Sequence, residues 1–179
     1  MDPFDDADLI AGEQARDSGD LPRARLRLEA AASRNNPVAL LDLLDVCFDL
    51  GDHHAVKAHL AHLEALAERS AESAYAASKA YECGPWLNLV APDQASAKRK
   101  EHLLQSGRLG NPMAQIEIAA NFGYGTNGFV EDLASFREWI ARAAEVLPLE
   151  AARCFSDVAS TKAIAVPEWA REALAKHDA

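Results

Sequence analysis

The amino-acid sequence predicts an all-α protein of about ten helices, and three observations support this fold class. Apolar residues recur with the spacing of one buried helix face, as at Val56, Leu60, Leu63 and Ala67. β-Branched residues are sparse, alanine is abundant, and no run alternates apolar and polar residues over the length of a strand. Glycine and proline divide the chain into segments of helical length.

The expected helices lie between breaks at which glycine can end one helix in a left-handed conformation or proline can begin the next. In chain order, the breaks are Gly19 to Pro22, Asn35 to Pro37, Gly51-Asp52, Gly84-Pro85, Gly107 to Pro112, Gly123 to Gly128, Pro148 and Val166-Pro167. They leave helices of about 10 to 18 residues, paired into five helical hairpins. The longest expected connections are 84–92 and 123–131.

Similar patterns recur along the chain, as is typical of repeat proteins. In the first half, a Gly-Asp turn followed by three apolar positions occurs at Gly19 and again at Gly51, a period of 32 residues. In the second half, a small residue, an aromatic residue and a glycine return at a period of 41 residues. The two sets are Ser73, Tyr81 and Gly84, and Ala114, Phe122 and Gly125. We expect a stack of repeats, because one hairpin cannot bury its apolar side alone.

These patterns resemble known repeat families. The stretch from Ala114 to Phe129, followed by Asp132, Trp139 and the Ala-Ala-Glu sequence at 143–145, resembles a Sel1-like repeat. Residues 73–110 resemble a looser copy of it. The first seventy residues are similar to tetratricopeptide repeats, which have small residues at set positions. The matching small residues are Gly12, Gly19, Ala24 and Ala31.

The resemblance implies a right-handed α-solenoid of about five stacked hairpins, in which the first helix of each hairpin lines a concave face. The implied units are tetratricopeptide-like hairpins at 5–36 and 37–70, Sel1-like repeats at 71–110 and 112–148, and a capping hairpin at 149–179. All five belong to one repeat domain, 1–179. Small residues such as Gly12 and Ala143 would let helices approach closely, and Trp139 is expected in the core.

Carrying the geometry of the repeat families over to this chain gives a predicted partner-binding surface on the first helices. Its residues are Asp6, Glu13, Asp17, Asp45, Phe48, Asp49, Glu72, Tyr75, Lys79, Glu82, Met113, Ile116 and Tyr124. This surface is acidic near the N-terminus and more apolar towards the fourth unit, and its field would steer a basic segment into place. An alternative interpretation is that Asp42, Asp45 and Asp49 form only the solvated face of an amphipathic helix.

The charge balance limits the classes of partner. The chain carries 28 Asp and Glu against 18 Lys and Arg, a formal net charge of −10. A nucleic-acid binder needs clustered cations, so we expect no nucleic-acid partner. No apolar run reaches the length of a membrane helix, and the acidic N-terminus is unlike a secretory signal. We expect a cytoplasmic protein with reduced thiols at Cys47, Cys83 and Cys154 and no membrane partner.

Catalytic and metal-binding patterns are weak. His53, His54, His59 and His62 lie close together in the sequence, but no cysteine or carboxylate completes a metal-ligand set at close spacing. The glycine-rich stretch 123–128 lacks the Lys-Ser/Thr ending of a phosphate-binding loop. No nucleophile has an evident base beside it. We therefore expect no metal, no cofactor and no enzymatic activity.

Two non-catalytic functions remain open. The chain could be an adaptor that holds a basic segment of a partner protein on its concave face. Alternatively, because proteins similar to the Sel1-like family include bacterial immunity proteins, it could neutralise an antibacterial toxin by direct binding. An inhibitor should hold one partner at about nanomolar strength, whereas a scaffold should hold several at about micromolar strength. The sequence leaves open whether the chain is a monomer or a dimer.

Overall fold

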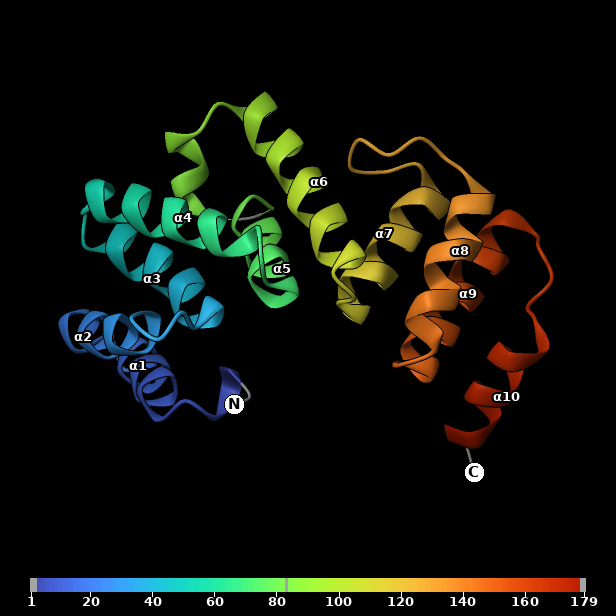
Figure 1. Cartoon of the computed structure of the whole chain (residues 1–179), viewed down its shortest axis with the longest axis horizontal. Helices are drawn as coiled ribbons and strands as arrows, with labels where there is room; N and C mark the ends of the chain where they lie inside the picture. Colours follow the sequence, from blue (N-terminus) through green and yellow to red (C-terminus); the bar gives the residue numbers. More distant parts are fainter. Residues whose placement is uncertain (1–2, 83, 178–179) are drawn as a thin grey trace. The chain divides into compact units, whose positions relative to one another are not determined.

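A computed structural model describes residues 3–82 and 84–177, and in this part the chain is entirely helical, without strands. The ten α-helices are α1 (Ala7–Asp17), α2 (Leu21–Ala32), α3 (Pro37–Asp49), α4 (His53–Ala67), α5 (Ala71–Ala80), α6 (Pro92–Arg108), α7 (Pro112–Tyr124), α8 (Leu133–Ala144), α9 (Pro148–Lys162) and α10 (Glu168–His177) (Figure 1). Two short 3-10 helices, η1 (Pro3–Asp5) and η2 (Pro85–Leu89), complete the described elements. The predicted fold class and number of helices are confirmed for this part of the chain.

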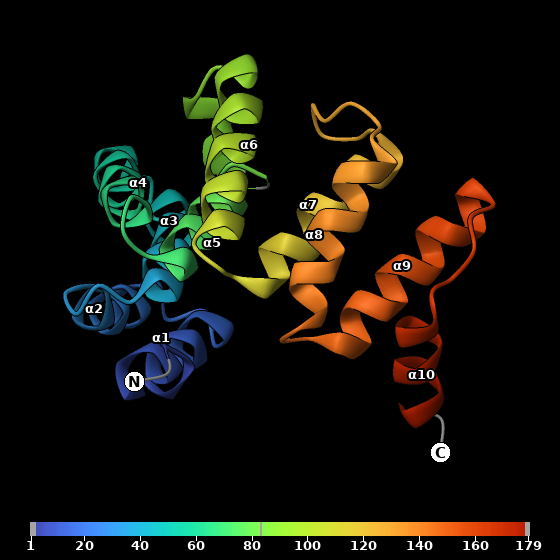
Figure 2. The ribbon, with the colours of Figure 1, turned by 45° about the vertical axis from the view of Figure 1, so that its right-hand side comes forward.

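The helices group into two compact units that divide after Ser106. In the first unit, each helix from α1 to α5 packs against the next along the chain (Figure 2). The first helices of successive hairpins also touch, since α1 contacts α3 and α3 contacts α5. Consecutive packing of this kind is typical of helical repeats. The handedness and the repeat type stay predictions.

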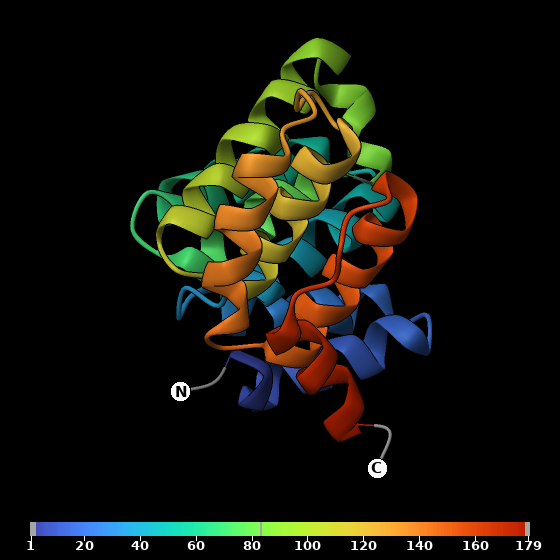
Figure 3. The ribbon, with the colours of Figure 1, turned by 90° about the vertical axis from the view of Figure 1, so that its right-hand side faces the viewer.

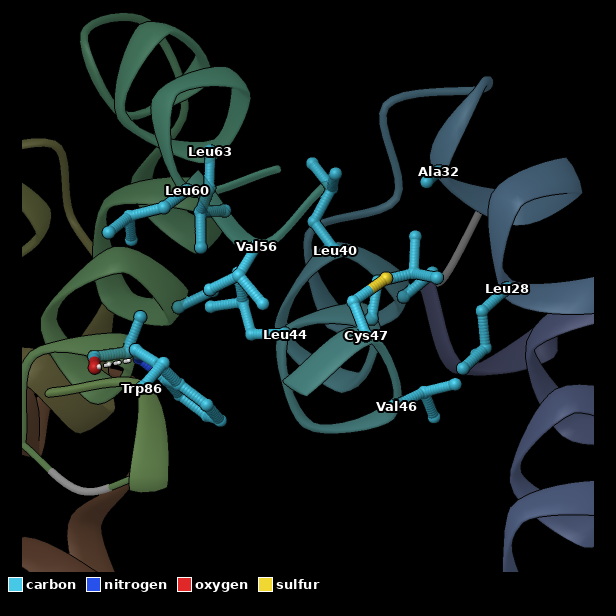
Figure 4. Close-up of a cluster of buried hydrophobic side chains, with 14 of the residues drawn as sticks. Leu28, Ala32, Leu40, Leu44, Val46, Cys47, Val56, Leu60, Leu63 and Trp86 are labelled. Atoms are coloured by element: carbon cyan, nitrogen blue, oxygen red, sulfur yellow. Dashed lines mark hydrogen bonds between the residues drawn. The ribbon is translucent and has the colours of Figure 1, made fainter. Parts of the chain in front are cut away.

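The core of the first unit consists of aliphatic side chains from successive helices. Leu40 and Leu44 from α3 meet Val56 and Leu63 from α4, and all four are almost fully buried (Figure 4). Burying a side chain of this size stabilises the fold by about 1.5 to 3 kcal/mol. The apolar periodicity that predicts these helices therefore marks the face that each one buries.

The helix η2 is an element that the sequence pattern did not predict, because the connection 84–92 was expected to be irregular. Gly84 has a φ of 143°, and a Cβ at this residue would lie 2.4 Å from the ring of Trp86. Glycine therefore allows the indole to fold back into the core, where Nε1 of Trp86 donates a hydrogen bond to the carbonyl oxygen of Ala80 at 3.0 Å. The connection thus adds a large apolar side chain to the core.

The second unit contains α7 to α10, which also pack in sequence order, and α7 touches α9 (Figure 3). Its core includes Phe136 and Trp139, as the repeat pattern predicted for Trp139. Two glycines expected at breaks lie inside helices. A Cβ on Gly107 would come within 2.4 Å of Ile118, and one on Gly123 within 2.9 Å of Val158. These glycines leave room for neighbouring side chains to pack against the backbone. The helices that contain them, α6 and α7, end at Arg108 and Tyr124.

Side-chain caps fix most helix starts. Asn36 and Asn111 accept hydrogen bonds from the first-turn amides of α3 and α7, and each is followed by proline. Asp20, Asp52 and Asp132 cap α2, α4 and α8 in the same way. Among the described helices, none has both the length and the apolar character needed to cross a membrane.

Candidate functional site

The predicted partner-binding residues fall into three groups on different first helices. In the first unit, one group lies on α1 with its N-cap and on α3, and a second lies on α5 and in the turn that follows it. The group of the second unit lies on α7. In that order the groups are Asp6, Glu13, Asp17, Asp45, Phe48 and Asp49; Glu72, Tyr75, Lys79 and Glu82; and Met113, Ile116 and Tyr124. Each group has a different charge environment.

Asp6 has a structural role at the start of α1. Its carboxylate accepts hydrogen bonds from the amides of Asp8 and Leu9 and forms an ion pair with Arg34, with Oδ1 2.6 Å from Nη2. Its pKa is held below the ordinary value, mainly by the hydrogen bond from Arg34. Asp6 is buried, so we leave it out of the binding surface.

Three aspartates on α1 and α3, Asp17, Asp42 and Asp45, lie around the side chain of Arg16, and Asp49 adds its charge next to Asp45. We call Asp17, Asp42, Asp45 and Asp49 the acidic face. Arg16 donates from Nη1 to Oδ1 of Asp42 at 2.6 Å, and its Nε lies 3.8 Å from Oδ1 of Asp17. α1 contacts α3, so carboxylates far apart in the sequence share one region of the surface. Glu13 is half-buried on the same helix as Arg16.

The acidic face carries more negative charge than Arg16 offsets. The side chain of Asp42 is 14% exposed, and its Oδ2 is buried without a hydrogen-bond partner among the described residues. Burial raises the pKa of Asp42 despite its bond to Arg16, and nearby Asp17 acts in the same direction. Burial also raises the pKa of Asp45, with Asp42 and Asp49 adding to the effect. Ionisation of these two carboxylates is therefore less favourable in the folded chain than in water.

An aromatic pair lies beside this face. Phe48 is half-buried, and its ring stacks on the exposed His53, with centroids 5.3 Å apart and planes 17° from parallel. Asp45 and Phe48 are three residues apart on α3 and therefore share one side of that helix. The acidic face thus has a flat aromatic group at its edge.

The predicted residues on α5 and in the turn after it are already paired. Glu82 accepts from Nζ of Lys79 at 2.6 Å and from Nη2 of Arg99 at 2.9 Å, and Lys79 lies 5.2 Å from the ring centre of Tyr75. Burial acts to raise the pKa of Glu82, but Lys79 and Arg99 outweigh it, so the pKa falls below its ordinary value. Glu72 accepts a hydrogen bond from Ser70. This group has little uncompensated charge.

The predicted residues of the second unit form an apolar group on α7. Met113 and Tyr124 are exposed, and Ile116 is half-buried. The predicted gradient from acidic to apolar side chains along one surface stays a prediction. Whether they bind a partner stays a prediction.

From sequence, Asp42 was expected only on the solvated face of an amphipathic helix, and no role was predicted for Arg16. The spacing of Asp42, Asp45 and Asp49 on one helix was a usable signal. The approach of Arg16 from another helix had no sequence signal, because it depends on how α1 packs on α3.

The described histidines and cysteines are dispersed and do not form a candidate metal centre. Among the described residues, no group of three or more His, Cys, Asp and Glu side chains is placed to hold a metal ion. His62 lies 3.2 Å from Oδ1 of Asn35. Cys47 is a buried free thiol, and burial raises the pKa of Cys154 to about 11. Cys83 lies outside the described residues.

Comparisons with protein-family models, with curated protein sequences and with solved structures gave no significant match to this chain. The resemblance to Sel1-like and tetratricopeptide repeats therefore stays a prediction. The function has to be inferred from the geometry and charge of the surface.

Proposed function

We propose that this chain is a non-catalytic protein-protein interaction module that binds a basic segment of a partner protein on its acidic face, as an adaptor does. The support comes from charge balance. Of the described groups that act on Asp42 and Asp45, Arg16 is the cation, whereas the other acidic-face carboxylates repel them. A cation supplied by a partner would offset this repulsion.

The observation that carries the proposal is the buried Oδ2 of Asp42, which lacks a hydrogen-bond partner among the described residues. A buried carboxylate oxygen without a donor costs about 1 to 3 kcal/mol or more. A partner cation held by the more exposed Asp45 and Asp49 would lower the electrostatic cost of the charge on Asp42 without reaching this buried oxygen. A merely solvated helix face would leave its carboxylates in water and would not raise their pKa by burial.

Arginine suits this surface better than lysine. A guanidinium can donate two parallel hydrogen bonds to one carboxylate and can also stack on an aromatic ring. Asp45 and Phe48 offer a carboxylate and a ring on the same side of α3. We therefore expect a partner segment with arginines spaced by about one helical turn, to match the spacing of Asp42, Asp45 and Asp49.

The test is a binding titration by fluorescence anisotropy. The probe is a labelled peptide of about ten residues with arginines one helical turn apart. The double variant Asp45→Lys with Asp49→Lys is expected to bind at least about tenfold more weakly than the unmodified chain. The matched control, Glu150→Lys with Asp157→Lys, makes the same change of net charge on exposed residues of α9 and should change the affinity less than about twofold.

Equal weakening in both double variants would mean that net charge alone attracts the peptide and would overturn the assignment to the acidic face. Unchanged binding in both would overturn it as well. A lysine-for-arginine version of the peptide is expected to bind about threefold more weakly. The affinity of partners captured from cell extract then distinguishes an adaptor from an inhibitor. One partner bound at about nanomolar strength would indicate an inhibitor and not an adaptor.

A further inference from the structure

A second cluster of ionisable side chains lies in the first unit, where α6 packs on α4 and α5. We call Glu64, Tyr81, Lys98 and His102 the α6 cluster. Oε1 of Glu64 accepts a hydrogen bond from the hydroxyl of Tyr81 at 2.9 Å and lies 3.1 Å from Nζ of Lys98. The imidazole of His102 stacks on the ring of Tyr81, with centroids 5.8 Å apart and planes 14° from parallel. One carboxylate on α4 thus joins all three helices.

His102 is the incompletely bonded member of this cluster. The residue is only 7% exposed, and its Nε2 is buried without a hydrogen-bond partner among the described residues. Oε1 of Glu64 lies 3.5 Å from Nε2, which is long for a hydrogen bond. This oxygen already accepts a hydrogen bond from Tyr81 and pairs with Lys98. His102 also lines a cavity of about 330 Å³ between α4 and α6. Among the described residues, the packing therefore leaves Nε2 of the imidazole without a close partner, beside a cavity.

The attachment of α6 relies strongly on polar contacts. Its N-terminal half is held by the ion pair between Arg99 and Glu82, and its end by a hydrogen bond from Ser106 to the carbonyl oxygen of Ala71 at 2.6 Å. Among the described side chains of α6, Ala95 and Leu103 are the buried apolar ones. So little apolar surface makes the docking of α6 sensitive to the loss of a single polar contact.

The charges that face His102 come from the α4 side and from α6. Glu64 on α4, Glu68 at the C-terminal cap of α4 and Glu101 on α6 are carboxylates, and Lys98 on α6 is a cation. Tyr81, at the C-terminal cap of α5, contributes an uncharged ring. Burial lowers the pKa of His102, and Lys98 lowers it further, which together outweigh the attraction of Glu64 and Glu101 for an imidazolium. A charged imidazole is thus less stable in this packing than in water.

We propose that the α6 cluster is a proton-sensitive lock, in which protonation of His102 releases α6 from α4 and α5 as the solution becomes mildly acidic. The folded chain takes up this proton less readily than a chain with α6 undocked. Docking is therefore strongest above the ordinary pKa of histidine and weakens as the pH falls below it. The lock is independent of the acidic face, because it lies on α4, α5 and α6.

The test is hydrogen exchange of backbone amides in the full chain, corrected for the intrinsic pH dependence of exchange. Between about pH 7.5 and pH 5, we expect the protection of α6 amides to fall by at least about tenfold relative to amides of α3 in the same unit. In His102→Phe, which keeps an aromatic ring against Tyr81 but cannot titrate, the fall should be less than about twofold. His54→Gln, at an exposed position on α4, should respond like the unmodified chain.

Unchanged relative protection of α6 in the unmodified chain would overturn the proposal, as would a full loss of protection that persists in His102→Phe. His102→Gln offers a second non-titrating variant of smaller size if the phenylalanine does not fit. A measurement on the unmodified chain avoids variants altogether. The imidazole of His102, followed by NMR, should take up its proton over the same pH range in which α6 opens, and separate ranges would contradict the lock.

Discussion

The acidic face on α1 and α3 and the predicted group on α5 look alike in sequence but differ in the structure. Both have acidic side chains and an aromatic residue on first helices of neighbouring hairpins. In the turn after α5, Glu82 is matched by Lys79 on α5 and Arg99 on α6. On α3, Asp42 and Asp45 share Arg16 with other aspartates. The number of acidic residues on a helix therefore does not give the net charge of its surface. That net charge also depends on the cations that neighbouring helices place beside the carboxylates.

The largest expected effect comes from removing the cation of the acidic face. Arg16→Met would leave Asp42 buried beside other carboxylates, and we expect it to lower the free energy of unfolding by about 2 kcal/mol. Urea unfolding followed by circular dichroism measures this change. The control is Arg27→Met, which removes an exposed partner of Asp8 and should cost less than about 1 kcal/mol. Equal losses of unfolding free energy in the two variants would show that burial of the Asp42 carboxylate does not depend on its ion pair with Arg16.

A smaller effect of opposite sign is expected from Asp45→Asn. Folding raises the pKa of Asp45, so its favourable contribution is complete below the unfolded pKa and is lost as the pH rises through the folded pKa. Near neutral pH the ionised Asp45 therefore opposes folding, and the amide should stabilise the chain by about 0.5 kcal/mol. Urea unfolding at neutral and acidic pH should show this gain disappear on acidification. A loss of stability at neutral pH would contradict the raised pKa.

The smallest effect is expected on α5. Lys79→Met removes one partner of Glu82, but Arg99 stays beside that carboxylate and the pair is open to water. We expect a loss of less than about 0.5 kcal/mol in the same unfolding experiment. A loss as large as that of Arg16→Met would mean that the two groups do not differ in compensation.

The fold was predictable from sequence because its determinants are local. Apolar spacing located the helices, and prolines such as Pro37 and Pro112 marked the starts of two of them. The 3-10 helix at Trp86 was missed because it forms only when an indole folds back over Gly84 into the core. Gly107 was predicted to lie in a break but lies within α6, because a glycine can mark either a turn or a place where another side chain packs against the helix.

The candidate site was predictable only in part. The spacing of Asp42, Asp45 and Asp49 identified a shared face of one helix, but not how much of it is buried. Asp6 was assigned to the surface because capping and partner binding both use aspartate. The roles of Arg16 and Arg34 depend on contacts between residues 26 and 28 positions apart, which a single sequence does not reveal.

The most direct test of uncompensated charge on the acidic face is an NMR titration of side-chain carboxyl carbons in the unmodified chain. The expected result is a pKa above 3.8 for Asp42 and Asp45, and a pKa below 4.5 for Glu82 in the turn after α5. Values at or below 3.8 for both aspartates would mean that their charge is fully compensated within the chain, and would contradict the account of the acidic face as a site for a basic segment.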